Sequence, residues 1–345
     1  MFRRLPHWST TLAKRTVVLV GSESLLSREI RDIVATSNTG LDLRLIAADD
    51  EQAGALARVG DEPAVLIELK AENLLGARSV ILAGSAVTNQ KALELVPPDA
   101  AVIDPTYTAE DQPEARLRAP LVESEPDEDA RDAAVHVIAH PAAIALALFL
   151  RRLHANDPIA RSVVQIFAPA SEHGTPGIQE LQEQTVSLLS FKNMPKTIFD
   201  AQASFNLLAK YGEEAPRSLE ESELRIERHL ATLLAMPGEG EGAPMPSIRL
   251  IQAPVFHGYS FSAWVQFEAN PGLEALESSM PMDSIEVRGA DFDPPSNVSQ
   301  AGLGGIAVGA ITPDRNDAEA CWFWLVADNL RLMAENAVAV ARELV

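Results

Sequence analysis

The feature that most constrains the fold is a series of short apolar runs, rich in β-branched residues, that alternate with segments of helical length. Five such runs are TVVLV at 16–20, LRLIAA at 43–48, AVLIEL at 64–69, SVILAG at 79–84 and AAVIDP at 100–105. Between the first two, residues 24–34 carry their leucines and isoleucines on one helical face. Runs that are apolar throughout are typical of strands buried on both faces of a parallel sheet. We therefore predict an α/β fold with a Rossmann-like, doubly wound parallel sheet.

The pattern changes after residue 157. A helical segment begins near Pro141 and ends at the sequence Asn156, Asp157, Pro158. Longer strands are predicted at 160–168, 248–256, 259–268 and 304–312, and helices at 177–189, 219–234 and 318–344. This change predicts two domains. A nucleotide-binding-type domain over 16–157 is completed by a C-terminal helix over 318–345, and an α+β domain over 158–317 is inserted between them.

The charge balance narrows the range of partners. The chain has 28 lysines and arginines against 49 aspartates and glutamates, which gives a formal net charge of −21. Such a charge repels phosphate backbones and anionic lipid headgroups, so we expect no nucleic-acid or membrane partner. Residues 1–15 are basic and lack the apolar segment of a secretory signal, which indicates a basic arm. The single cysteine, Cys321, excludes an internal disulfide and fits a cytoplasmic protein.

Eight segments, taken in order, resemble the landmarks of aspartate-semialdehyde dehydrogenases. They read VVLVGSESLLSREI, ILAGS, VIDP, APLVESEPD, VIAHPAAIALAL, EHGTPGIQELQEQ, APVFHGYS and DNLRLMAENAVAVARELV. The resemblance extends from residue 16 to residue 345. It implies that 158–317 is a dimerisation domain and that the chain forms a homodimer. It also implies a chemistry in which a thiolate adds to an aldehyde and a nicotinamide coenzyme takes the hydride.

Four positions that carry this chemistry in the family hold other side chains here. Ala143 stands at the position of the nucleophilic cysteine, and Ala168 at that of the glutamine that orients the intermediate. Gln252 replaces the arginine that clamps the substrate, and Tyr259 replaces the catalytic histidine. We therefore expect no catalytic residues at the family positions. The chain is predicted to be a non-catalytic homologue: a dimeric scaffold, a partner subunit of an active family enzyme, or a ligand sensor.

The coenzyme site is altered as well. The family turn G-A-T-G-x-V-G reads GSESLLS at 21–27, where Glu23 adds a negative charge close to the expected pyrophosphate. The residues still expected to meet a coenzyme are Gly21, Ser22, Ser24, Asp49, Gly84 and Ser85. The acidic stretch ADDE at 48–51 would repel a 2′-phosphate. We expect no bound cofactor. NADP is improbable on this sequence, and NAD is the coenzyme that the turn could still accept.

The alternative is an NAD-dependent semialdehyde oxidoreductase with a rearranged active site. His140, His173 or His257 could then transfer protons, as a pair of histidines or with a carboxylate such as Glu172. No spacing typical of metal ligands is present, so no metal site is predicted. The acidic segment 123–129 lacks the spacing of an EF-hand and indicates a solvated loop.

Overall fold

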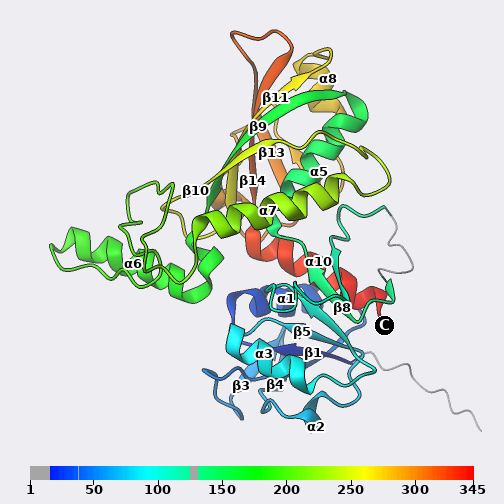
Figure 1. The fold of residues 1–345 in the computed structure, drawn as a ribbon, viewed down its shortest axis with the longest axis vertical. Coiled ribbons are helices and arrows are strands. Elements are labelled where there is room, and N and C mark those ends of the chain that lie inside the picture. Colours follow the sequence, from blue (N-terminus) through cyan, green and yellow to red (C-terminus); the bar gives the residue numbers. More distant parts are fainter. Residues whose placement is uncertain (1–15, 38, 125–130) are drawn as a thin grey trace, which may run out of the picture.

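The computed structural model describes residues 16–37, 39–124 and 131–345 (Figure 1). The predicted basic arm at 1–15 and most of the acidic segment 123–129 lie outside these ranges. The described chain builds two six-stranded sheets, with α7 and α10 between them, while α6 extends away from both (Figure 1). No helix in these ranges is long and apolar enough to cross a membrane.

Sheet A is parallel throughout, in the order β2-β1-β5-β6-β8-β7. Its strands are β1 (Thr16–Val20), β2 (Asp42–Ile46), β5 (Ser79–Leu82), β6 (Ala101–Asp104), β7 (Ala115–Arg118) and β8 (Val135–Ile138). Its helices are α1 (Leu25–Thr36), α2 (Ala71–Leu74), α3 (Ala86–Leu95) and α10 (Asn329–Glu343). Helix α5 (Pro141–Asn156) follows β8 in the chain but packs with α7, α8 and β9, beside sheet C (Figure 1).

Both faces of sheet A are covered by helices. Val17 and Leu19 of β1 pack into one apolar core with residues of α1 and α10. Val18 and Val20 point the other way, into a second core with residues of α2 and α3. Because successive side chains of a strand alternate between faces, a run that is apolar throughout requires two cores. The predicted Rossmann-like fold is confirmed.

The run at 64–69 is an exception, since it was predicted as a strand of this sheet. Residues of β3 (Leu56–Val59) and β4 (Glu62–Val65) instead form a separate antiparallel hairpin. Only Ile67 reaches sheet A, through an isolated bridge to Ile46. The turn at Gly60, with φ +60°, brings the two short strands together locally. The prediction was wrong because β3, which is closer in sequence than sheet A, pairs with the first residues of this run.

Sheet C is mixed, in the order β10-β9-β11-β14-β13-β12. Its strands are β9 (Ile159–Ala168), β10 (Ser247–Gln252), β11 (Tyr259–Phe267), β12 (Ile285–Val287), β13 (Ile306–Pro313) and β14 (Ala320–Ala327). The remaining helices are η1 (Ala170–His173), α6 (Gly174–Leu189), α7 (Leu219–Leu234), α8 (Leu273–Ser279) and α9 (Asn297–Gln300). This sheet with its helices agrees with the inserted α+β architecture, and the proposed limits of the domains stay predictions.

Residues 320–327 form strand β14 where a helix was predicted from residue 318. Trp322 is exposed and Phe323 is buried, as the two faces of a strand require. The helix begins only after Asp328, whose carboxylate accepts the amides of Leu330 and Arg331. An apolar aromatic run fits either element, and pairing with β11 and β13 decides for the strand.

Candidate functional site

The carboxyl ends of β1 and β5 meet at one edge of sheet A, where two predicted coenzyme-binding residues are in contact. Gly21 follows β1 with φ +77°, a conformation that L side chains rarely adopt. A Cβ at Gly21 would lie 2.2 Å from the Cα of Gly84, which comes after β5. Only glycine therefore fits the first position of the turn. Open parallel sheets bind their ligands outside this edge.

The three predicted serines use their hydroxyl groups within the fold. The Ser22 side chain is fully buried, and its hydroxyl lies within 3.1 Å of two main-chain carbonyl oxygens. Ser24 caps α1 by accepting an amide of its first turn at 3.1 Å. Ser85 caps α3 in the same way, also at 3.1 Å. The Ser24 and Ser85 hydroxyls therefore fix the starts of α1 and α3, and the Ser22 hydroxyl is bonded within the turn.

Two acidic side chains at this edge lie elsewhere than expected. The Glu23 carboxylate does not crowd the turn, because it turns away to an ion pair with Arg31 at 3.1 Å. Glu51 occupies the turn instead and accepts the amides of Ser22 at 3.1 Å, Glu23 at 2.7 Å and Ala48 at 3.0 Å. Sequence reasoning had included Glu51 only as part of an acidic stretch. Its place on the turn depends on the pairing of β1 with β2.

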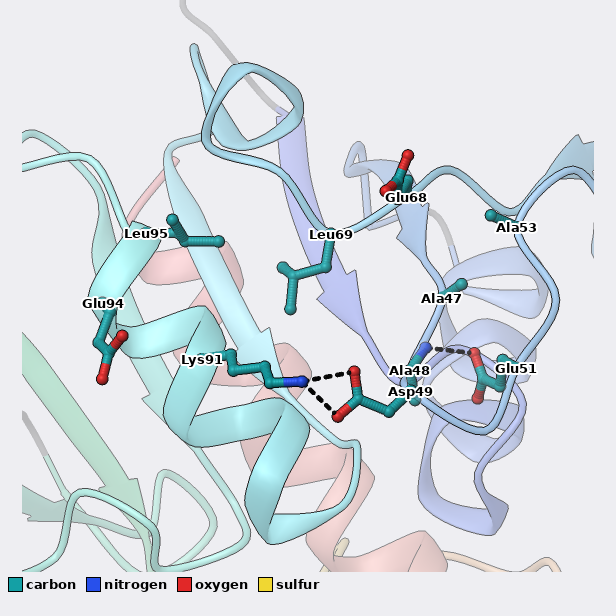
Figure 2. Close-up of a pocket in the computed structure, with 10 residues that line it drawn as sticks. All are labelled: Ala47, Ala48, Asp49, Glu51, Ala53, Glu68, Leu69, Lys91, Glu94 and Leu95. Carbon is teal, nitrogen blue, oxygen red and sulfur yellow. Dashed lines mark hydrogen bonds and ion pairs between the residues drawn. The ribbon is translucent and has the colours of Figure 1, made fainter.

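A cavity of about 420 Å³ lies beside this turn (Figure 2). Its lining residues are Ala47, Ala48, Asp49, Glu51, Ala53, Glu68, Leu69, Lys91, Glu94 and Leu95. The Lys91 ammonium group contacts both carboxylate oxygens of Asp49, at 2.9 and 3.1 Å. The predicted coenzyme residue Asp49 therefore has a cation beside it, which offsets its negative charge.

A second group of predicted residues lies at the start of α5. His140 caps this helix, since its Nδ1 accepts the Ala142 amide at 3.2 Å. The ring proton is therefore on Nε2, which lies 3.0 Å from a carboxylate oxygen of Glu172. Ala143 is fully buried in the first turn of α5. Its methyl group provides no lone pair for covalent catalysis.

Glu172 is the centre of a buried polar cluster. Its second carboxylate oxygen accepts the Tyr259 hydroxyl at 2.7 Å. Burial acts to raise the pKa of Glu172, but the neighbouring His140 and the Tyr259 hydrogen bond lower that pKa to about 2. Burial and the Glu172 carboxylate together raise the pKa of Tyr259 well above its usual range. At neutral pH Tyr259 is therefore a donor to Glu172 and not a base.

Gln252, at the end of β10, has its whole amide group engaged. Its nitrogen donates to the carbonyls of Ala168 at 3.0 Å and Ala253 at 2.8 Å, and its oxygen accepts the Tyr211 hydroxyl at 2.6 Å. The same hydroxyl lies 3.0 Å from Nε2 of His173. Burial lowers the pKa of His173 to about 4. The position of the family's substrate clamp is therefore bonded internally.

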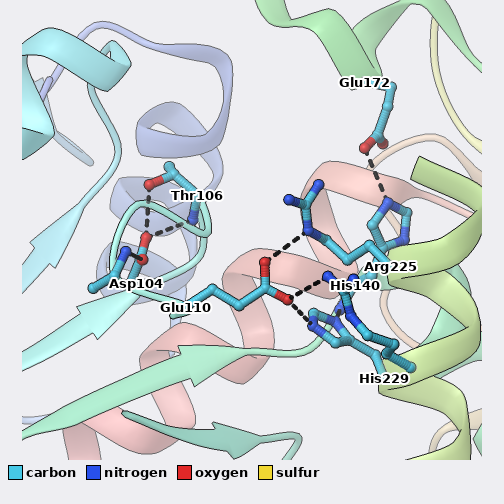
Figure 3. Close-up of polar contacts among 9 residues, drawn as sticks. Asp104, Thr106, Glu110, His140, Glu172, Arg225 and His229 are labelled. Atoms are coloured by element: carbon cyan, nitrogen blue, oxygen red, sulfur yellow. Dashed lines mark hydrogen bonds and ion pairs between the residues drawn. The ribbon is translucent and has the colours of Figure 1, made fainter. Parts of the chain in front are cut away.

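A second branch of the cluster joins α7 to the loop after β6 (Figure 3). The His140 amide donates to Nδ1 of His229 at 2.9 Å, and Nε2 of that ring lies 2.8 Å from Glu110. Arg225 donates to the other Glu110 oxygen at 2.9 Å, and its guanidinium lies 4.7 Å from the centre of the Tyr107 ring. Burial acts to raise the pKa of Glu110, but His229 and Arg225 lower it to about 2.

Sequence reasoning missed this branch, because Glu110 and His229 are 119 residues apart. The one local signal is the helical spacing that places Arg225 and His229 on one face of α7. His257, the third predicted histidine, enters hydrogen bonds in the described ranges only through its main-chain carbonyl, which accepts the Asn297 amide at 3.1 Å. No group of three His, Cys, Asp or Glu residues in those ranges is placed to hold a metal ion.

Known proteins share this fold over nearly its whole length. The aspartate-semialdehyde dehydrogenase of Rickettsia bellii is 24% identical over 344 residues, which cover 96% of this chain and 98% of that protein. The crystal structure of aspartate-semialdehyde dehydrogenase II from Vibrio cholerae, complexed with ASA, matches with a TM-score of 0.79 and 21% identity. That match covers 95% of this chain and 97% of the other.

The expectation that NADP is improbable is wrong. The aspartate-semialdehyde dehydrogenase of Candida albicans, solved with NADP, matches 95% of this chain and 97% of its own, with a TM-score of 0.65 and 15% identity. A relative with this fold thus holds the coenzyme that the sequence had made improbable. That reasoning relied on the free charge of the acidic stretch at 48–51, but the Asp49 carboxylate pairs with Lys91.

A family model gives the most specific comparison. The dimerisation domain of semialdehyde dehydrogenases matches residues 150–332, which is more than half of the chain. The matched region contains all of sheet C and the helices α6 to α9. Together with the relatives of almost equal length, this match shows that the chain belongs to the aspartate-semialdehyde dehydrogenase family.

Proposed function

We propose that this chain is a non-catalytic member of its family, which acts as a dimeric scaffold, as a partner subunit of an active family enzyme, or as a ligand sensor. The observation that carries this proposal is the closed cluster around Glu172. Both oxygens of Glu172, both ring nitrogens of His140 and the whole amide of Gln252 are bonded to groups of the same chain. Covalent catalysis requires a nucleophile with a free lone pair at this place, and Ala143 has none.

The outer face of sheet C supports the dimeric part of the proposal. Trp264 and Trp322 lie opposite each other on β11 and β14, and both indoles donate to one oxygen of Asp314, at 3.1 and 2.8 Å. Val163 extends this apolar surface on β9, with 38% of its area exposed. Large exposed apolar surfaces are uncommon on monomers, and the matched family region is a dimerisation domain.

Light scattering of the purified protein tests the dimer. We expect twice the mass of the 345-residue chain for the wild type and a shift towards the single mass for Trp322→Arg. The control is Leu56→Arg, which places the same charge on an exposed leucine of the separate β3–β4 hairpin. A wild type with the mass of one chain at micromolar concentration contradicts the homodimer.

A rearranged oxidoreductase is the second candidate, because His140 and Glu172 form a buried histidine–carboxylate pair at 3.0 Å. Such pairs move protons in many active sites. In this arrangement, however, the His140 ring already bonds the Ala142 amide through its other nitrogen. To act as an acid and a base, the ring must pass through its doubly protonated form. Protonation of Nδ1 would remove the lone pair that accepts the Ala142 amide and so break the cap of α5.

The decisive assay follows the reduced nicotinamide with aspartate semialdehyde and phosphate, with NADP and with NAD in separate reactions. An active family enzyme serves as the positive control. We expect no turnover above background, and Ala143→Cys alone should not restore it because residues that act as a unit are not additive. Turnover near about 1 s⁻¹, an ordinary enzymatic rate, would overturn the proposal. Loss of that turnover in His140→Gln would establish the second candidate.

A further inference from the structure

Glu51 holds an arrangement of amides that resembles an anion-binding site. The amides of Ser22 and Glu23 come from the turn between β1 and α1, and the amide of Ala48 comes from the end of β2. All three donate to one carboxylate, at 2.7 to 3.1 Å. Two separate loops therefore converge on a single negative group.

The same donors suit the oxygens of a phosphate. The Ser22 and Glu23 amides lie on the turn directly before Ser24, the N-cap of the 12-residue helix α1, so a negative group that they hold lies near the positive end of the helix dipole. The two Glu51 oxygens divide the amides between them, one taking Ser22 and Ala48 and the other taking Glu23. A phosphate or pyrophosphate group presents comparable oxygens, so that it and the carboxylate compete for one place.

The position of Glu51 would allow its carboxylate to move away from the three amides. It lies in the loop between β2 and β3, its side chain is only half-buried, and it lines the cavity of about 420 Å³ (Figure 2). Within the described ranges its carboxylate has no cationic partner, so the three amides are what holds it. Lys91, which also lines the cavity, is paired with Asp49 at 2.9 Å.

We propose that Glu51 is an internal stand-in for a phosphate group, an autoinhibitory contact that a pyrophosphate-bearing small molecule must displace before it binds at the β1–α1 turn. The proposal does not depend on whether the chain is catalytic, since it concerns only access to the turn. It makes binding at this edge of sheet A a competition between one side chain and one ligand group.

Calorimetric titration with inorganic pyrophosphate tests this competition in the full-length wild type, Glu51→Ala and Asp50→Ala. Asp50→Ala is the matched control, because it removes the same charge from an exposed neighbour. We expect Glu51→Ala to bind pyrophosphate at least about tenfold more tightly than either the wild type or the control. Titrations with NADP and NAD at equal ionic strength then show whether a dinucleotide or a free diphosphate gains more.

Thermal melting gives an independent measurement. Glu51→Ala should melt lower than the wild type without multivalent anions, and pyrophosphate should restore its melting temperature while moving that of the wild type much less. Equal affinities and equal pyrophosphate-dependent shifts in all three proteins would overturn the proposal. If Glu51→Ala fails to fold, Glu51→Gln keeps the side-chain volume and should show a gain in affinity of the same sign. A Glu51→Gln protein with wild-type affinity would equally contradict the proposal.

Discussion

The turn at the edge of sheet A and the cluster at the start of α5 are both filled by groups of the chain itself, but to different depths. One half-buried side chain, Glu51, fills the turn. At α5, groups from η1, β10, β11 and α7 bond one another around Glu172 and His140. A single half-buried side chain can move without unfolding its neighbours, whereas a buried network changes only as a unit. We therefore expect that the Glu51 side chain can be displaced from the turn (the open region), whereas the network around Glu172 (the closed region) stays intact in the folded protein.

The largest effect should come from the closed region. Glu172→Ala leaves Nε2 of His140 and the Tyr259 hydroxyl buried without a partner, and we expect a loss of about 3 to 5 kcal/mol in the free energy of unfolding. Glu172→Gln keeps an acceptor for one of them and should lose less. Urea denaturation measures both. A loss below about 1 kcal/mol in Glu172→Ala would mean that the network does not hold the region closed.

Gly21→Ala should give the next largest effect, a loss of about 2 to 3 kcal/mol, because the new Cβ would meet the main chain of Gly84 in a left-handed conformation. Gly54→Ala is a matched control, since Gly54 has φ +87° but nothing within 4 Å of the added Cβ. The difference between the two variants isolates the contact. Equal losses would show that the turn has room to adjust.

The sequence predicted the turn better than the cluster, and the reason is physical. Each half of the turn region is a local pattern of glycine and serine after a strand: Gly21 and Ser24 follow β1, and Gly84 and Ser85 follow β5. Strands that are apolar throughout and the helix face of α1 are local patterns too, so the strands at 16–20, 43–48, 79–84 and 100–105 were predicted. The run at 64–69 was wrongly placed in sheet A, and β7 was not predicted.

Pairings between distant segments could not be predicted in the same way. Glu51 reaches an amide 29 residues away, and the contacts of Glu172 span 32 residues to His140 and 87 to Tyr259. The error at 320–327 has the same origin, since only pairing with β11 and β13 separates a strand from a helix there. Sequence patterns thus fix the elements, and long-range contacts decide which side chains meet.

Acid should weaken the closed region through its histidines. Burial lowers the pKa of His173 to about 4, from an unfolded value near 6.5. His136, on β8 of sheet A and outside this region, has its pKa lowered to about 4 as well, by burial and by the charge of Arg118. Between pH 6.5 and pH 4 each histidine is protonated in the unfolded chain but neutral in the folded chain. The free energy of unfolding therefore decreases as the pH falls from 6.5 to 4. We expect a slope of about 1 kcal/mol per pH unit for each histidine.

Urea denaturation at pH 7, 6 and 5 checks this slope. His173→Asn should make it shallower, while His257→Asn, outside the network, should leave it unchanged. A slope that is the same in all three proteins would show that His173 is free to take up a proton in the folded state. The carboxylates act in a lower range: the pKa of Glu172 is about 2, so its contribution is lost only as the pH falls below about 4.5.

The smallest effect should come from the open region. Lys91 and Asp49 are both substantially exposed, so their ion pair is screened by water, and Lys91→Ala should change the free energy of unfolding by less than about 0.5 kcal/mol. Among the described residues that line the cavity, Lys91 is the one cation, so pyrophosphate affinity of the Glu51→Ala protein should fall when Lys91→Ala is added. A double variant that loses affinity with no change in urea stability would separate ligand binding from folding at the turn. A loss of several kcal/mol from Lys91→Ala would instead show that this edge of sheet A is as tightly interlocked as the cluster around Glu172.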